Sequence, residues 1–152
     1  GLATKSKDPS TQNGAIVLDE YGDIIGEAAN NFPRDVKETA ERWERPAKYF
    51  YVEHAERNAI FDALTSGLDI PNTMVCPWAA CADCARAIVL SGVQVLVRMP
   101  HPLDLTNDRW DATCVAGDEI MIESGVQIIE LDYKHRGNPI VLRRNGEELV
   151  IQ

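Results

Sequence analysis

Two short segments decide how this chain folds around a site: His54-Ala55-Glu56 and Cys81-Ala82-Asp83-Cys84. One imidazole and two thiolates suit Zn²⁺, and three protein ligands leave the fourth tetrahedral position for water. Glu56 lies two residues from the histidine, so it can move the proton of that water without being a ligand itself. We therefore predict a catalytic residue, Glu56, beside a zinc ion held by three ligands: His54, Cys81 and Cys84.

The spacing within each segment predicts where two helices begin. Residues i and i+2 of a helix point about 200° apart, so His54 and Glu56 converge only where a helix starts. Cys81 and Cys84 stand at i and i+3 and share a helix face. Both pairs therefore lie on a first helical turn, where the positive end of the helix dipole favours thiolate over thiol.

An H-x-E motif followed by a C-x-x-C motif is the signature of zinc deaminases that act on nucleobases. It predicts hydrolytic attack on C4 of a cytosine-like ring or C6 of an adenine-like ring. Cys76 and Cys81 are a weaker alternative ligand pair, because Pro77 lies between them and the spacing is not helical. We expect Cys76 and Cys114 to be buried as small apolar side chains.

Hydrophobic periodicity predicts one α/β domain over residues 1–152. Alternating or β-branched runs predict strands at 14–19, 23–29, 73–76, 93–97 and 126–131. Helical spacing predicts helices at 53–65, 81–90 and 111–124. Asn145-Gly146 predicts the turn of a last hairpin with strands at 140–142 and 149–151. Residues 30–50 and 98–109 read as irregular, and the strands that follow helices predict a partly parallel sheet.

Charge narrows the class of substrate. The chain has 152 residues, a formal net charge of −9 and a pI of about 4.7. A polynucleotide normally needs a basic face, so we expect a small-molecule nucleotide partner and no polynucleotide. The densest basic cluster, the first candidate to hold one phosphate, consists of Arg34, Arg42, Arg45 and Lys48.

Hydrophobicity, cysteine usage and the first residue inform predictions of membrane association, the cellular compartment and the state of the N-terminus. No apolar run approaches the roughly 20 residues of a membrane span, so we expect no membrane partner. Cysteines used as metal ligands predict a reducing, cytoplasmic compartment. The chain starts at Gly1 without a methionine, and we expect a trimmed N-terminus.

Several segments resemble deoxycytidylate (dCMP) deaminases, a family within the cytidine deaminase superfamily. The resemblance covers roughly residues 5–97 and, more loosely, extends to 131. Its motifs are Ser6-Lys7-Asp8-Pro9-Ser10-Thr11-Gln12-Asn13-Gly14-Ala15, Asn30-Asn31-Phe32-Pro33-Arg34, Arg42-Trp43-Glu44-Arg45-Pro46-Ala47-Lys48-Tyr49 and His54-Ala55-Glu56-Arg57-Asn58-Ala59-Ile60. Together these loop motifs are more specific than the metal ligands alone.

The resemblance implies a three-layer α/β/α fold with a five-stranded mixed sheet, assembled as a homo-oligomer. It implies a Zn²⁺ cofactor and conversion of dCMP to dUMP with release of ammonia. Asn30 matches the family's asparagine that contacts the sugar. Trp78 and Ala79 would frame the base and offer backbone carbonyls to its amino group. From the basic cluster we take Arg34 as a further candidate substrate-binding residue.

Two departures keep alternatives open. Ala80 stands where the family usually has proline before the first cysteine, and Trp78 is large for its place. The altered segment favours, as an alternative substrate, a modified cytosine nucleotide, a guanine or a pterin. A polynucleotide-editing deaminase is disfavoured by the charge. A non-catalytic zinc scaffold is disfavoured by Glu56, because a structural site needs no proton shuttle and normally has four protein ligands.

Overall fold

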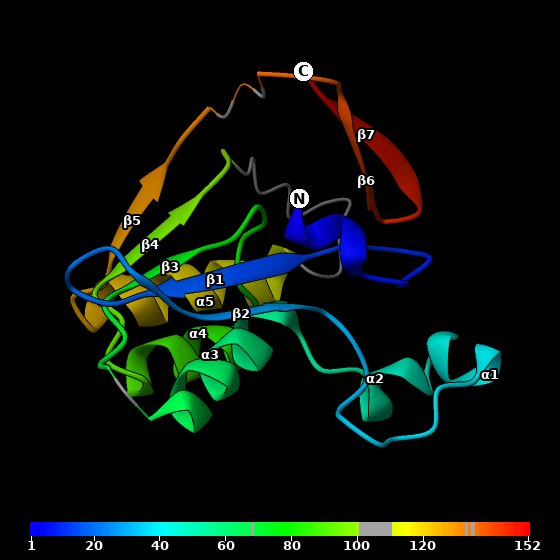
Figure 1. Cartoon of the computed structure of the whole chain (residues 1–152), viewed down its shortest axis with the longest axis horizontal. Coiled ribbons are helices and arrows are strands. Elements are labelled where there is room, and N and C mark those ends of the chain that lie inside the picture. The colour runs from blue at the N-terminus through cyan, green and yellow to red at the C-terminus, as the bar shows by residue number, and fades with distance from the viewer. Residues whose placement is uncertain (68, 101–110, 133, 135) are drawn as a thin grey trace.

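Five strands form one mixed sheet, in the order β2-β1-β3-β4-β5 (Figure 1). The computed structural model describes residues 1–67, 69–100, 111–132, 134 and 136–152. The strands of the sheet are β1 (Gly14–Leu18), β2 (Ile24–Ala29), β3 (Thr73–Val75), β4 (Val95–Arg98) and β5 (Gln127–Glu130). The predicted α/β fold with a five-stranded mixed sheet is thus confirmed.

Three longer helices pack on this sheet: α3 (Ala55–Ser66), α4 (Ala82–Leu90) and α5 (Asp111–Glu123). Short helices are η1 (Leu2–Lys5), α1 (Ala40–Trp43) and α2 (Lys48–Tyr51). The predicted irregular stretch 30–50 therefore holds two single-turn helices, which are too short to show a helical period. Most of the predicted loop 98–109 lies outside the described residues.

The direction of the strands places the loops that carry the site. β1 pairs antiparallel with both β2 and β3, whereas β3, β4 and β5 run parallel. Parallel neighbours need a crossover, and α4 and α5 supply it. The segments that lead out of β2 and β3 therefore run toward the starts of α3 and α4 (Figure 1).

The main core lies between the sheet and the three longer helices. It is built from alternate strand residues and small helix residues, among them Ala15, Val17, Ala59, Ala63, Met74, Ile88, Leu96 and Met121. α3 packs very closely on β2, because a Cβ on Gly26 would lie 2.4 Å from the carbonyl oxygen of Ala59. This close approach holds the middle of α3 against the edge strand β2.

The other face of the sheet carries η1 and a separate hairpin, β6 (Ile140–Arg144) and β7 (Glu147–Ile151). In the described residues this layer is a 3₁₀ turn and two strands, while the longer helices occupy the first face (Figure 1). The hairpin turn at Asn145-Gly146 has φ values of 52° and 83°, as the sequence predicted for an Asn-Gly turn. An apolar groove remains between the hairpin, η1 and the sheet.

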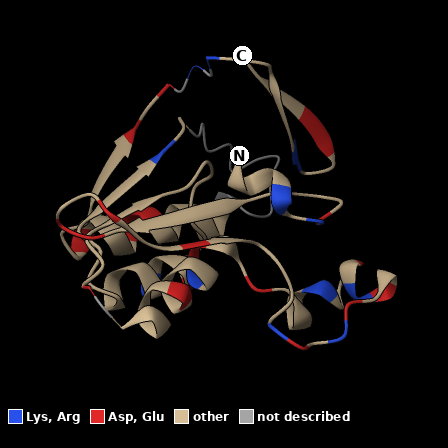
Figure 2. Ribbon diagram, in the orientation of Figure 1, with Lys and Arg blue, Asp and Glu red and all other residues tan. Residues whose placement is uncertain are grey.

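Charge is spread over the molecule. Figure 2 shows Asp and Glu on the helices, at the sheet edge and on the hairpin, with several Lys and Arg side chains around α1 and α2. Within the described part of the chain, no helix has both the length and the apolar character that a membrane crossing requires.

Candidate active site

The metal-binding side chains come from the starts of two helices. His54 is the N-cap of α3, with φ −72° and ψ 149°, and Cys81 is the N-cap of α4, with φ −68° and ψ 167°. Glu56 and Cys84 lie in the first turns of these helices. The extended N-cap backbone turns residue i toward residue i+2 or i+3, which is the geometry that the spacing predicted.

The three candidate ligands converge on one point. His54 Nδ1 lies 3.5 Å from Cys81 Sγ and 3.4 Å from Cys84 Sγ, and all three ligand atoms lie within 4.8 Å of one another. A tetrahedral Zn²⁺ with ordinary Zn–N and Zn–S bonds separates its nitrogen and sulfur ligands by about 3.5 Å. The donor set and its nitrogen–sulfur distances therefore fit Zn²⁺.

Electrostatic interactions favour the thiolate form of Cys81. The hydrogen bond with Cys84 lowers the pKa of Cys81 to about 4, with His54 adding to the effect against the opposing influence of burial. The interaction with Cys81 and burial raise the pKa of Cys84 well above its usual range. The pair thus shares one negative charge before a metal ion binds, and a divalent cation would stabilise the second thiolate.

Glu56 lies inside the protein beside the ligands. Glu56 is only 3% exposed, and its Oε2 lies 3.7 Å from Cys84 Sγ. Burial raises the pKa of Glu56, and this effect outweighs the charge of His54, which acts to lower it. A carboxyl whose pKa is shifted toward neutral pH can both accept and release a proton during a reaction.

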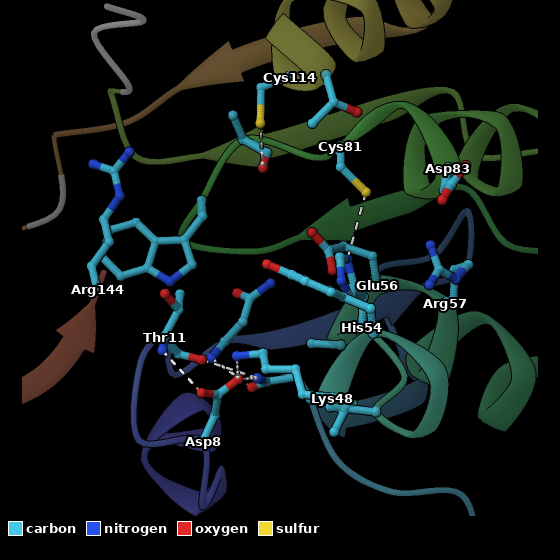
Figure 3. A pocket seen from close by; sticks show the side chains of 18 of the residues that line it. Asp8, Thr11, Lys48, His54, Glu56, Arg57, Cys81, Asp83, Cys114 and Arg144 are labelled. Carbon is cyan, nitrogen blue, oxygen red and sulfur yellow. Dashed lines mark hydrogen bonds and ion pairs between the residues drawn. The ribbon is translucent and has the colours of Figure 1, made fainter. Parts of the chain in front are cut away.

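Arg57 reaches the same cluster from the next position of α3. Its Nη1 donates to Cys84 Sγ at 3.3 Å, and its Nε donates to Glu53 Oε1 at 2.7 Å. Figure 3 shows the Arg57 guanidinium close to Glu56 and His54. The guanidinium therefore places a fixed positive charge next to one ligand sulfur, a contact that sequence reasoning missed.

His54, Glu56, Arg57 and Cys81 line a pocket of about 280 Å³. Asp8 organises its wall, since Oδ1 accepts from the backbone N–H groups of Ser10 and Thr11. Its Oδ2 accepts from Lys48 Nζ at 2.6 Å and from Asn30 Nδ2 at 3.1 Å. In Figure 3 Asp8, Thr11 and Lys48 form one group, set apart from His54 and Glu56.

Asn30 lines the pocket and is 7% exposed. Both hydrogen-bond contacts of its Nδ2 are internal, to Asp8 Oδ2 and to the carbonyl oxygen of Thr11. Its Oδ1 accepts from the backbone N–H of Asn13 at 2.8 Å and has a second lone pair. Asn30 is therefore oriented so that it would receive, rather than donate, a hydrogen bond from a ligand.

Trp78 and Ala79 also line the pocket. The indole Nε1 of Trp78 donates to the carbonyl oxygen of Gln12 at 2.8 Å, which accommodates this large side chain at 8% exposure. Cys76 and Cys114, buried as predicted, donate through their thiols to the carbonyl oxygens of Trp78 and Ala79, respectively. The two backbone carbonyl groups that the family resemblance assigns to the base are therefore each in contact with a buried thiol.

α5 packs directly against the segment before α4. Thr113 Oγ1 accepts from the backbone N–H of Ala82 at 3.0 Å. A Cβ on Gly117 would lie 2.5 Å from the carbonyl oxygen of Ala80 and 3.2 Å from the carbonyl carbon of Cys81. Glycine at this position lets α5 approach the backbone of a metal ligand.

The structure does not bring Arg34 into this pocket. Its side chain is 94% exposed, and its Nε lies 3.9 Å from Oδ2 of Asp35, a residue with a left-handed φ of 65°. Arg45 and Lys48 of the same basic cluster do line the pocket. Of the other predicted site residues, all seven line it or contribute a ligand atom beside it: Asn30, His54, Glu56, Trp78, Ala79, Cys81 and Cys84.

Sequence reasoning missed the wall opposite the helix starts. Arg144 and Asn145 come from the turn end of β6, and Asp8 and Thr11 from the segment before β1. The Asp8 motif was noticed only through the family resemblance. Arg144 and Asn145 gave no local signal of a place in the pocket, because they contact Trp78 and Thr11, which lie far away in the sequence.

Comparisons with known proteins agree with this geometry. The family model described as "Cytidine and deoxycytidylate deaminase zinc-binding region" matches residues 1–99. An uncharacterized deaminase of Aliivibrio fischeri is 31% identical over 128 residues, covering 81% of each chain. Deoxycytidylate deaminase of Homo sapiens is 32% identical over 118 residues, which span 73% of this chain and 64% of the human protein.

A solved structure shares the fold. The dCMP deaminase of cyanophage S-TIM5, in complex with dCMP and dUMP, superposes with a TM-score of 0.65 at 22% identity. The match covers 85% of this chain and 88% of that chain. At this level of identity the likeness concerns the arrangement of the elements.

Proposed function

Because the chain belongs to the cytidine and deoxycytidylate deaminase family, whose members are zinc-dependent deaminases, we propose that it hydrolyses dCMP to dUMP and ammonia. One observation carries the proposal: a ligand set of one imidazole and two sulfurs lies in a pocket beside the buried carboxyl of Glu56. The similarity to human deoxycytidylate deaminase supports the choice of dCMP.

The residues of this chain account for the proton transfers. Zn²⁺, when held by His54, Cys81 and Cys84, supplies the Lewis acidity that makes water nucleophilic near neutral pH. Glu56 takes a proton from the attacking water and passes it to N3 of the cytosine ring. The same carboxyl then relays the second proton to the amino group on C4. One water is consumed, and one ammonia leaves as the carbonyl of uracil forms.

Other residues would orient the substrate. Asn30 Oδ1 would accept a hydrogen bond from a sugar hydroxyl, since both contacts of its Nδ2 are internal. In the described part of the chain, the carbonyl oxygens of Trp78 and Ala79 accept from the thiols of Cys76 and Cys114, and thiols are weak donors. They therefore retain acceptor capacity for the amino group of the base.

A substrate panel tests the proposal. Zinc-loaded protein is incubated with dCMP, deoxycytidine, dCTP and cytosine, and ammonia release is followed together with the loss of cytosine absorbance. We expect dCMP to have the highest kcat/KM and dUMP to be the product. Absence of turnover on every cytosine compound, at full zinc content, would contradict the proposal.

The alternative is a different heterocycle as substrate. The segment from Pro77 to Ala80, with the indole of Trp78 beside the site, favours a base pocket unlike that of other dCMP deaminases. Guanine, pterin and modified cytosine nucleotides therefore belong in the same panel. Ammonia release from one of these, and not from dCMP, would establish the alternative.

We also propose a cytoplasmic homo-oligomer that uses no polynucleotide substrate. The net charge of −9 opposes binding of single-stranded DNA or RNA, which a binding assay at low salt would check. The four free cysteines suit a reducing compartment. A second copy would cover the apolar groove on the second sheet face, which includes Leu2, Ile16, Val75, Val97 and Ile140. Sedimentation equilibrium tests this, and a monomer at every concentration would contradict it.

A further inference from the structure

The turn end of the β6–β7 hairpin is docked on the segment before β1. Gln12 N donates to the carbonyl oxygen of Arg143 at 2.8 Å, and Arg143 N donates back to Gln12 Oε1 at 3.1 Å. Asn145 N donates to Thr11 Oγ1 at 3.0 Å. The guanidinium of Arg143 donates to the carbonyl oxygen of Asp8 at 3.3 Å. The hairpin is therefore fixed to the wall of the pocket.

This docking aims the next side chain at the pocket. Successive side chains of a strand point to opposite faces, so Arg143 anchors the hairpin while Arg144 faces the other way. The Arg144 guanidinium lies over the Trp78 ring, 5.3 Å from its centroid, and lines the pocket with Asn145. Figure 3 shows Arg144 beyond Thr11 and well apart from Arg57, at the end of the pocket away from Asp83.

A second guanidinium is attached to the same segment. Arg45 lines the pocket, and its Nη2 donates to Ser10 Oγ at 3.1 Å. The backbone carbonyl of Ser10 accepts from Gly146 N at 2.9 Å, so the hairpin and Arg45 share this anchor. The charge of Lys48 is balanced by Asp8, which is 2% exposed, and that of Arg57 by Glu53. Arg45 and Arg144 bring two further guanidinium groups to the pocket lining, both on elements anchored to Ser10.

We propose that Arg45 and Arg144 bind the 5′-phosphate of the substrate, so that the C-terminal hairpin makes the enzyme selective for a nucleoside monophosphate. This inference rests on the proposed function, which places the base at the end of the pocket formed by His54, Glu56 and Cys81. We call this the metal end. A guanidinium offers planar, charged donors that match phosphate oxygens, and stacking on an aromatic ring holds it in one orientation. Deoxycytidine, which has no phosphate, makes no use of either arginine.

The test compares dCMP with deoxycytidine in single variants of the zinc-loaded enzyme. Arg144→Gln and Arg45→Gln should each lower kcat/KM for dCMP by about ten- to hundredfold, the range for a hydrogen bond to a charged group. The value for deoxycytidine should stay within about twofold, because the metal end is untouched. Lys37→Gln, an exposed charge change outside the pocket, serves as the control and should alter neither value.

Two further measurements separate a binding role from a structural one. The variant Arg144→Lys keeps the charge but loses the planar fork, so it should recover only part of the activity on dCMP. Calorimetry should show that Arg144→Gln weakens binding of dUMP and leaves binding of deoxyuridine unchanged. A thermal unfolding curve checks that the hairpin remains folded, and Arg45→Gln tests the same site from another element.

The outcomes are distinct. An equal loss on dCMP and deoxycytidine in both glutamine variants would overturn the inference while leaving the deaminase function intact. A loss confined to dCMP in Arg34→Gln, with Arg144→Gln unaffected, would overturn it in favour of the arginine that the sequence suggested. If wild-type enzyme turns over neither compound, the proposed function and the inference fail together.

Discussion

The two ends of the pocket are built in different ways. The metal end comes from two helix starts, where His54 and Glu56 are two residues apart and Cys81 and Cys84 three apart. The other end, which we call the mouth, joins the segment around Asp8 to the hairpin at Arg143, 135 residues later in the chain. Local backbone geometry fixes the first end, whereas docking of distant segments fixes the second.

This difference separates chemistry from selectivity. The metal end holds every group that the proposed proton transfers need, and each of its residue pairs is positioned by one helix start. The mouth holds arginines and the Asp8–Lys48 ion pair, which contact neither ligand sulfur. Damage to the mouth should therefore change which substrate is used, and damage to the metal end should stop the reaction.

Removal of the metal should have the largest effect. A chelator should abolish turnover and lower the melting temperature by about 5 °C or more, because a bound ion stabilises only the folded state. Added Zn²⁺ should restore both. The measurement is deaminase activity with a parallel thermal scan, and full activity in metal-free protein would contradict the account.

Glu56→Gln should lower kcat by about 10³-fold, since a positioned proton-transfer group typically contributes that much. The amide keeps the shape of the carboxyl, so the zinc content should equal that of the wild type. Steady-state kinetics and metal analysis on the same preparation check this. Glu123→Gln, an exposed change at the end of α5, is the control. Undiminished turnover in Glu56→Gln would refute its role.

Lys48→Met should damage the mouth and spare the metal end. It leaves the carboxylate of Asp8, which is 2% exposed, without its cation, and such a loss costs about 3 kcal/mol of folding stability. Because Asp8 also holds Asn30, KM for dCMP should rise more than kcat falls. Urea unfolding and kinetics measure the two effects. Wild-type stability together with reduced zinc content would contradict this prediction, because it would mean that Lys48 supports the metal end and not the mouth.

Gly117→Ala should have the smallest effect. The added methyl would clash with the backbone of Ala80, and overpacking of this kind costs about 1–3 kcal/mol. The shift of α5 should displace the backbone of Cys81, so zinc should be released faster to a competing chelator. Glu123→Ala in the same helix should change the free energy of unfolding by less than about 0.5 kcal/mol. Identical stability of the two variants would argue against close packing here.

The metal end and the sheet could be predicted because their signals are local. The helix starts at His54 and Cys81 follow from spacing alone, and the sheet follows from β-branched runs such as Val93–Val97, where β4 begins at Val95. α1 and α2 have four residues each, so they show no period. The hairpin turn was predicted from Asn145-Gly146, but its docking on Thr11 was not, since no pattern in either segment names its partner.

Arg34 shows the limit of reading charge from sequence. It belongs to the same basic cluster as Arg45, yet its side chain is 94% exposed and does not line the pocket. Arg144, which stands outside the cluster, lines the pocket. Proximity in sequence therefore identified a basic segment but not the arginines that face the site.

X-ray absorption at the zinc edge tests the central claim most directly. For the zinc-loaded enzyme without substrate, the account predicts one nitrogen at about 2.0–2.1 Å, two sulfurs at about 2.3 Å and one oxygen that is not from the protein. A shell of four protein ligands, or one with three or four sulfurs, would mean that the site is closed. That result would contradict a catalytic metal held by His54, Cys81 and Cys84.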